Sequence, residues 1–221
     1  MKTSSLIATS ILAAVASLGT VGCSTFEKSA PDATKPVGGK AINLLQFRND
    51  VQATRSAIAR TNDALSRIPG SPNAQDAYAT YSAELTTLAA LTEKTSLESA
   101  AVRNSGKELF AQWDAETQSI KNPDIRAIAE TRRAKLQAAY GEMLTPLIEA
   151  RANFTPLISD FTDLRKALAL DLTPAGIDAV KPLITKVNAE SVTTIKSLDA
   201  LAVELDKIAA VLPPPTVAPV K

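Results

Sequence analysis

The chain has no histidine and only one cysteine, and these absences exclude much of enzyme chemistry. Zinc sites of the usual ligand types, Ser-His-Asp and Cys-His nucleophile systems and haem ligation by histidine all need residues that the sequence lacks. Carboxylates are plentiful, but they lie at helical surface spacing among lysines and arginines: Glu84, Glu93, Glu98, Asp114 and Glu116. We expect no enzyme, no cofactor and no metal, with acid–base catalysis by a carboxylate pair as the alternative.

The sequence also lacks an excess of charge of either sign. Its 24 basic and 23 acidic residues give a net charge of +1, so there is no basic excess to bind nucleic acid or to hold the chain on anionic lipid. Aromatic residues make up only 4 % of the chain, and the motif Gly-x-x-x-x-Gly-Lys-Ser/Thr of a phosphate loop is absent. We therefore expect no nucleic-acid partner.

The N-terminal segment is typical of an export signal. Lys2 is followed by an apolar run over residues 6–16 and then by small residues up to the single cysteine, Cys23. Val21 and Gly22 resemble the lipobox of bacterial lipoproteins, whose cysteine receives a diacylglycerol and becomes the new N-terminus; Thr20 stands where leucine is usual. We expect a signal peptide at 1–22 and lipidation at Cys23. An ordinary secretory signal that happens to contain a cysteine is the alternative.

Composition divides the rest of the chain into three parts. Residues 23–40 contain Pro31, Pro36, Gly38 and Gly39 and predict a flexible tether. Residues 41–212 predict a helical bundle domain, and residues 213–221 form a proline-rich tail that we expect to be disordered. Loss of residues 1–22 removes Lys2 and leaves 199 residues with 23 basic and 23 acidic side chains.

Four stretches of the bundle domain carry residues of one face at alternating spacings of three and four, as the a and d positions of a coiled coil do. These seams, as we name them, run from Leu44 to Ile68, from Tyr78 to Ile120, from Arg133 to Leu168 and from Ile177 to Leu212. The second seam is small and polar in its middle, at Thr92, Thr95, Ser99 and Gly106.

The breaks between the stretches carry strong helix-boundary signals. Residues 69–72 (Pro-Gly-Ser-Pro) forbid continuation of a helix, and Asn122-Pro123 and Thr173-Pro174 each combine an N-cap residue with proline at the first helical position. Such short connections predict antiparallel neighbours. We predict an all-α fold: an elongated antiparallel helical bundle or coiled coil with a long central hairpin, with helices of about 40, 75, 70 and 55 Å.

One segment resembles the signature of a known family. Residues 109–116 (Leu-Phe-Ala-Gln-Trp-Asp-Ala-Glu) are similar to the signature of the bacterial domain of unknown function 2959, with further matches at Asn122 with Arg126, at residues 156–163 and at residues 170–180. The resemblance covers roughly residues 41–210 and implies an exported all-helical protein, often with a lipoprotein-type signal. This chain has Ala-Leu-Asp-Leu-Thr at 169–173 where the family usually carries a more polar, histidine-containing string. The family implies no activity.

Several functions fit these observations. The first is a membrane-anchored periplasmic lipoprotein acting as a scaffold or adaptor. We expect it on the periplasmic face of the outer membrane. The residue after Cys23 is Ser24, and not the aspartate that is the usual signal for retention in the inner membrane. The second is a binding module that uses the hairpin tip, which we define as residues 108–135, where the shorter outer helices leave the hairpin uncovered. The candidate contacts there, for a protein or envelope partner or a second copy, are Phe110, Trp113, Arg126, Arg132 and Arg133.

Two alternatives stay open beside these. Trp113 occupies an a position and can simply pack against the facing helix. The small residues of the second seam can either admit close helix approach or leave space for an apolar ligand inside the bundle.

The C-terminal residue, Lys221, follows the proline-rich tail. A lipid-anchored helical protein with a terminal lysine resembles the layout of lipoproteins joined to peptidoglycan, so Lys221 is a candidate attachment site for the cell wall.

Overall fold

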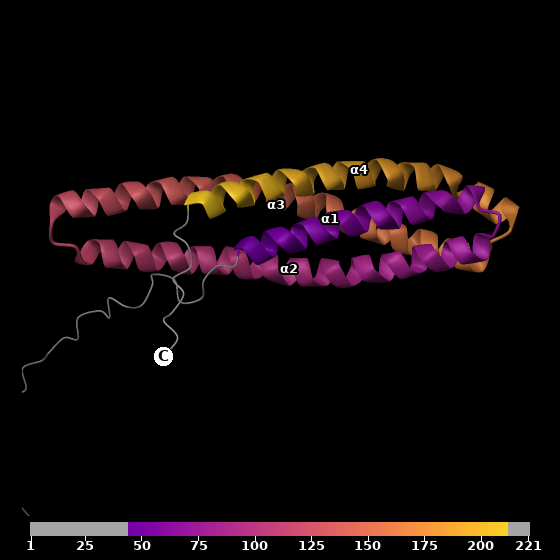
Figure 1. Ribbon diagram of the computed structural model, residues 1–221, viewed down its shortest axis with the longest axis horizontal. Coiled ribbons are helices and arrows are strands. Elements are labelled where there is room, and N and C mark those ends of the chain that lie inside the picture. The colour runs from indigo at the N-terminus through magenta and orange to yellow at the C-terminus, as the bar shows by residue number, and fades with distance from the viewer. Residues whose placement is uncertain (1–43, 212–221) are drawn as a thin grey trace, which may run out of the picture. The chain divides into compact units, whose positions relative to one another are not determined.

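A computed structural model describes residues 44–211, and within that range the chain is all-α (Figure 1). The helices are α1 (Leu44–Arg67), a 3-10 turn η1 (Ile68–Gly70), α2 (Ala74–Ser119), α3 (Pro123–Leu170) and α4 (Pro174–Val211). They lie side by side with short connections, so the prediction of an antiparallel bundle with a long central hairpin, α2–α3, is confirmed. The predicted signal peptide, tether and tail lie outside the described residues.

Helices α3 and α4 begin where the sequence predicts. The side chain of Asn122 accepts hydrogen bonds from the backbone N–H groups of Asp124 and Ile125 at 2.9 and 3.2 Å, and α3 starts at the next residue. Thr173 accepts one from the N–H of Gly176 at 3.3 Å, and α4 starts at the proline that follows. These side chains satisfy N–H groups that have no partner within their own helix.

The four predicted seams form the core of the bundle. Every residue of the first seam is buried: Leu44, Phe47, Val51, Thr54, Ile58, Thr61, Leu65 and Ile68. Most of the third and fourth seams are buried as well. In the second seam, Thr92, Thr95 and Ser99 are only half-buried, as their small polar side chains predict. The core is therefore thinnest along the middle of α2.

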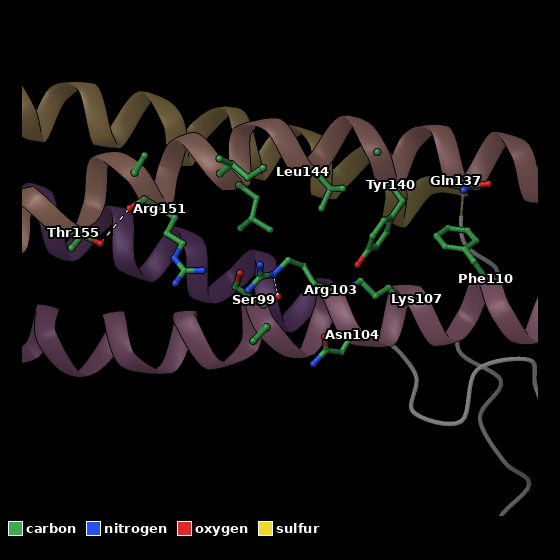
Figure 2. Close-up of a pocket in the computed structure, with 15 residues that line it drawn as sticks. Ser99, Arg103, Asn104, Lys107, Phe110, Gln137, Tyr140, Leu144, Arg151 and Thr155 are labelled. Atoms are coloured by element: carbon green, nitrogen blue, oxygen red, sulfur yellow. Dashed lines mark hydrogen bonds between the residues drawn. The ribbon is translucent and has the colours of Figure 1, made fainter.

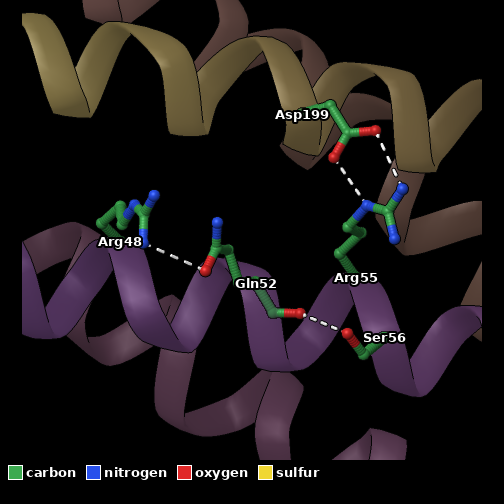
Figure 3. Close-up of polar contacts among 5 residues, drawn as sticks. All are labelled: Arg48, Gln52, Arg55, Ser56 and Asp199. Carbon is green, nitrogen blue, oxygen red and sulfur yellow. Dashed lines mark hydrogen bonds and ion pairs between the residues drawn. The ribbon is translucent and has the colours of Figure 1, made fainter.

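Helix α1 packs between α2 and α4, and α4 packs on α3. Ion pairs between helices accompany this packing. Figure 3 shows the guanidinium group of Arg55 on α1 donating to both carboxylate oxygens of Asp199 on α4, at 2.6 and 3.3 Å. Both partners are substantially exposed, so such a pair contributes at most about 1 kcal/mol to stability. The pair nevertheless forms only when Arg55 lies opposite Asp199, so it favours one register of α1 along α4.

Tyrosine hydroxyl groups connect α2 to α3. The chain has three tyrosines, and each hydroxyl donates to a backbone carbonyl of the facing helix. Tyr78 and Tyr81 bind the carbonyls of Arg165 and Phe161 near one end of the hairpin. Tyr140 binds the carbonyl of Val102, at 2.6 Å, nearer the tip. We call these three contacts the tyrosine clamps.

The clamp at Tyr140 depends on a glycine. A Cβ atom added at Gly106 would lie 2.3 Å from two atoms at the end of the Tyr140 ring, a distance that no real contact allows. Gly106 is buried inside α2, so its lack of a side chain is what lets the ring reach the carbonyl of Val102. Among the small residues of the second seam, Gly106 is therefore explained by the close approach of α2 and α3.

We expect Gly106→Ala to destabilise the protein by about 1–3 kcal/mol, because the new methyl group must displace a buried ring. The loss outweighs the gain of about 1 kcal/mol that alanine brings over glycine inside a helix. The matched control is Gly141→Ala on α3, where nothing lies within 4 Å of the added Cβ, so this variant should be more stable than the parent. Urea unfolding measures both, and equal stabilisation of the two variants would contradict the close contact.

Ionisation of the tyrosines offers a second test. Burial raises the pKa of Tyr140 to about 12 and also raises that of Tyr81, whereas an unfolded tyrosine has a pKa of about 10. The stability that these groups contribute is therefore complete below pH 10 and is lost as the pH rises towards 12.

We expect absorbance at 295 nm to show Tyr81 and Tyr140 still protonated at pH 11 in the folded protein. The free energy of unfolding should decline above pH 10. Tyr140→Phe should remove one of the late-titrating groups and, through the lost hydrogen bond, about 1 kcal/mol of stability. Ionisation of Tyr81 and Tyr140 near pH 10, without unfolding, would be incompatible with their buried positions.

Candidate functional site

The tip residues that the sequence suggested are largely engaged within the hairpin itself. The ring of Phe110 meets that of Tyr140 edge-on, with 5.6 Å between centroids, and the guanidinium carbon of Arg133 lies 5.9 Å from the Phe110 centroid. Arg133 also pairs with Asp114 at 2.6 Å. A cation–π contact is therefore present at the tip, but it joins the two helices of the hairpin to each other.

The other three tip candidates make different contacts. Arg126 donates from Nε to the carbonyl of Ile120 at 3.0 Å and so closes the turn between α2 and α3. Trp113 is half-buried and packs against the core. Arg132 is exposed and forms no ion pair with any described residue. The structure therefore brings together Phe110 and Arg133 and leaves only Arg132 free to bind.

Cys23 and Lys221, the candidate sites of lipidation and cell-wall attachment, lie outside the described residues.

A groove opens between α2 and α3 on the tip side of the bundle. We define the groove as an open space of about 1140 Å³ that residues from Ser99 to Phe110 on α2 and from Gln137 to Thr155 on α3 line (Figure 2). The apolar part of its lining is Ala100, Phe110, Tyr140, Gly141, Leu144, Leu147, Ile148 and Ala152. Its α2 wall begins at Ser99, one of the small residues of the second seam, and continues towards the tip.

A smaller space of about 210 Å³ lies deeper, among all four helices. We call it the inner cavity. Its apolar lining comes from α1, α3 and α4: Phe47, Val51, Leu147, Ala150, Phe154, Leu198 and Leu201. The small residues of the second seam, Thr92, Thr95 and Ser99, also line it. The hydroxyl groups of Thr95 and Thr54 lie 2.9 Å apart.

The groove and the inner cavity share part of their walls. Ser99, Arg103, Leu147, Arg151 and Thr155 line both spaces. The inner cavity therefore adjoins the groove, with two arginines at the junction.

Every charged side chain of the groove is basic. Arg103, Lys107 and Arg151 line it, and none of the described lining residues is acidic. No ion pair joins any of the three to a carboxylate within residues 44–211. Figure 2 shows Arg103 reaching from α2 and Arg151 from α3 into the space between the helices. The Nε of Arg103 makes one long hydrogen bond, 3.4 Å, to the carbonyl of Ser99.

Sequence reasoning found the small seam residues beside this site but missed its arginines. A signal was present. Arg103, Lys107 and Arg151 have no acidic residue three or four positions away on either side, although such pairs are common elsewhere in the chain, as at Arg67 with Asp63. A basic residue without a helical partner is free to serve a ligand.

A second polar cluster joins α1 to α2. The Nζ of Lys94 lies 2.8 Å from Oδ1 of Asp50. A hydrogen bond from Glu98 lowers the pKa of Asp50 to about 2. Burial raises the pKa of Glu98. Two carboxyl groups with diverging pKa values can act as acid and base. None of the three residues lines the groove or the inner cavity, so we assign the cluster to helix packing.

Two features are absent from the described helices. Residues 44–211 contain no group of three or more potential metal ligands. No helix in the same range is long and apolar enough to cross a membrane.

Comparison with known proteins gave one match. The model of the family described as "Protein of unknown function (DUF2959)" matches residues 47–211, from the first turn of α1 to the last residue of α4. No curated protein and no solved structure matches the chain.

Proposed function

This chain belongs to the DUF2959 family, and we propose that it is a membrane-anchored periplasmic lipoprotein that acts as an adaptor. The proposal gives residues 1–22 the role of a signal peptide, Cys23 that of the lipid attachment site and the hairpin tip that of the surface offered to a partner. It places the protein on the periplasmic face of the outer membrane. It involves no catalysis.

The observation that carries the adaptor role is the uncovered end of the hairpin. Figure 1 shows the turn between α2 and α3 extending past the ends of α1 and α4. Ile125 and Ile128, just beyond that turn, are 55 % and 69 % exposed. Apolar side chains on a projecting, well-ordered element are typical of binding surfaces.

The internal contacts of the tip support the same role. Arg126 holds the turn through the carbonyl of Ile120, and Arg133 joins the helices through Asp114. A surface that is already ordered loses less conformational entropy on binding. These arginines therefore position the tip, and the exposed isoleucines together with Arg132 are the residues we expect to contact the partner.

The anchor is tested at the mature N-terminus. We expect mass spectrometry of the protein from bacterial membranes to show a chain that begins at Cys23 and carries acyl groups. Cys23→Ser should remove the acylation and release the protein from membranes into the soluble periplasmic fraction. An unmodified Cys23, or cleavage at another position, would overturn the anchor.

The adaptor role is tested by crosslinking in cells. A photoreactive residue at position 125 or 128 should give the same discrete adduct, because both side chains lie on the exposed tip. The matched control is position 183 on α4, where Leu183 is 52 % exposed but far from the tip in the chain. We expect no such adduct from position 183. The yield of the adduct from positions 125 and 128 should fall in an Arg126→Ala variant, because the turn loses the hydrogen bond from Arg126 to the carbonyl of Ile120. Identical products from positions 128 and 183 would contradict a dedicated tip surface.

A further inference from the structure

We propose that the groove between α2 and α3 binds one anionic phospholipid. The phosphate lies among Arg103, Lys107 and Arg151, and an acyl chain runs along the apolar floor towards the inner cavity. This site is separate from the lipid that Cys23 would carry and from the tip surface. It does not rest on either part of the proposed function.

Charge is the first argument. The whole chain is nearly neutral, with 24 basic and 23 acidic residues, yet the groove gathers three bases and none of its described lining residues is an acid. Two of the bases are arginines that face each other from opposite helices (Figure 2). A guanidinium group donates paired hydrogen bonds that match the oxygens of a phosphate. An anionic group is therefore the complement that this lining lacks.

The second argument is the apolar space beside those bases. Leu144, Leu147 and Ile148 line the groove, and Leu147 continues into the inner cavity, where Phe154 and Leu198 join it. Ile148 is 66 % exposed, so part of this apolar lining faces solvent. A ligand with an anionic head and an apolar chain covers both kinds of lining at once.

The third argument is the origin of the space. The tyrosine clamps hold α2 to α3 at Tyr81 with Phe161 and at Tyr140 with Val102. Between these clamps, beyond Leu85 and Leu88, the second seam offers only the small side chains of residues 92, 95 and 99, which line the inner cavity. The inner cavity therefore lies between two contacts that fasten α2 to α3, and the groove continues from it past Tyr140, which lines the groove itself.

A second copy of the chain fits the groove poorly. In a two-fold symmetric dimer the same surface meets itself, so the unpaired Arg103, Lys107 and Arg151 of both copies would be brought together. Like charges in contact are unfavourable, and no described lining residue supplies a carboxylate to offset them.

Native mass spectrometry of the full-length protein, extracted in a mild detergent at fixed concentration, tests the proposal. The probes are dioctanoyl phosphatidylglycerol, which is anionic, and dioctanoyl phosphatidylcholine, which carries the same chains and phosphate with an added cation. We expect one phosphatidylglycerol per chain, at saturation, with at least about tenfold higher affinity than phosphatidylcholine. The choline cation would meet a lining that has three bases and no described acid.

Two variants locate the site. Arg103→Gln with Arg151→Gln should abolish the preference for phosphatidylglycerol. The matched control, Lys121→Gln with Lys135→Gln, removes two exposed charges that form no ion pair with the described residues of the tip, and it should leave the preference unchanged. Ser99→Phe fills the junction of the groove and the inner cavity, so it should weaken binding of both lipids. Circular dichroism reports whether each variant keeps its helices.

Three results would overturn the proposal. They are equal affinity for the two lipids, an unchanged preference in a folded Arg103→Gln, Arg151→Gln variant, and lipid binding that never saturates at one per chain. A stable dimer that the lipids do not dissociate and that needs Arg103 would assign the groove to self-association instead.

Discussion

The spacing of α2 and α3 is the constraint on which the candidate sites depend. The two longest helices are fastened to each other by tyrosine hydroxyl groups that reach backbone carbonyls of the facing helix. One of these contacts exists only because Gly106 has no side chain. Where α2 presents Thr92, Thr95 and Ser99, no clamp forms and the inner cavity lies between the helices. The groove extends from that space past Tyr140 towards the tip.

Basic side chains serve two different purposes in this bundle. Near the tip, Arg126 and Arg133 bind a carbonyl, a carboxylate and an aromatic ring, so their charge is used inside the fold. In the groove, Arg103 and Arg151 have no carboxylate partner among the described residues. Neither the net charge nor the composition of the chain shows this difference. The difference makes the groove the candidate for small-ligand binding, and it leaves the tip as a surface for a larger partner.

The two proposals describe one protein with separable parts. The anchor rests on the sequence around Cys23, the adaptor role on the uncovered hairpin end, and the lipid site on the lining of the groove. The match to the DUF2959 family covers the four helices, and the family's description assigns no activity.

The sequence by itself determined the helices, their ends and the core face. Alternating spacings of three and four identified residues such as Leu65, Leu157 and Leu201, all of which are buried, because helical period is a local property. The caps at Asn122 and Thr173 were equally local. The tertiary structure alone decided which side chains are free. Arg133 finds Asp114 and Arg103 finds no acid, because charge pairing between helices depends on the register of residues distant in the chain. Register is set by packing across the whole bundle, and no local pattern encodes it.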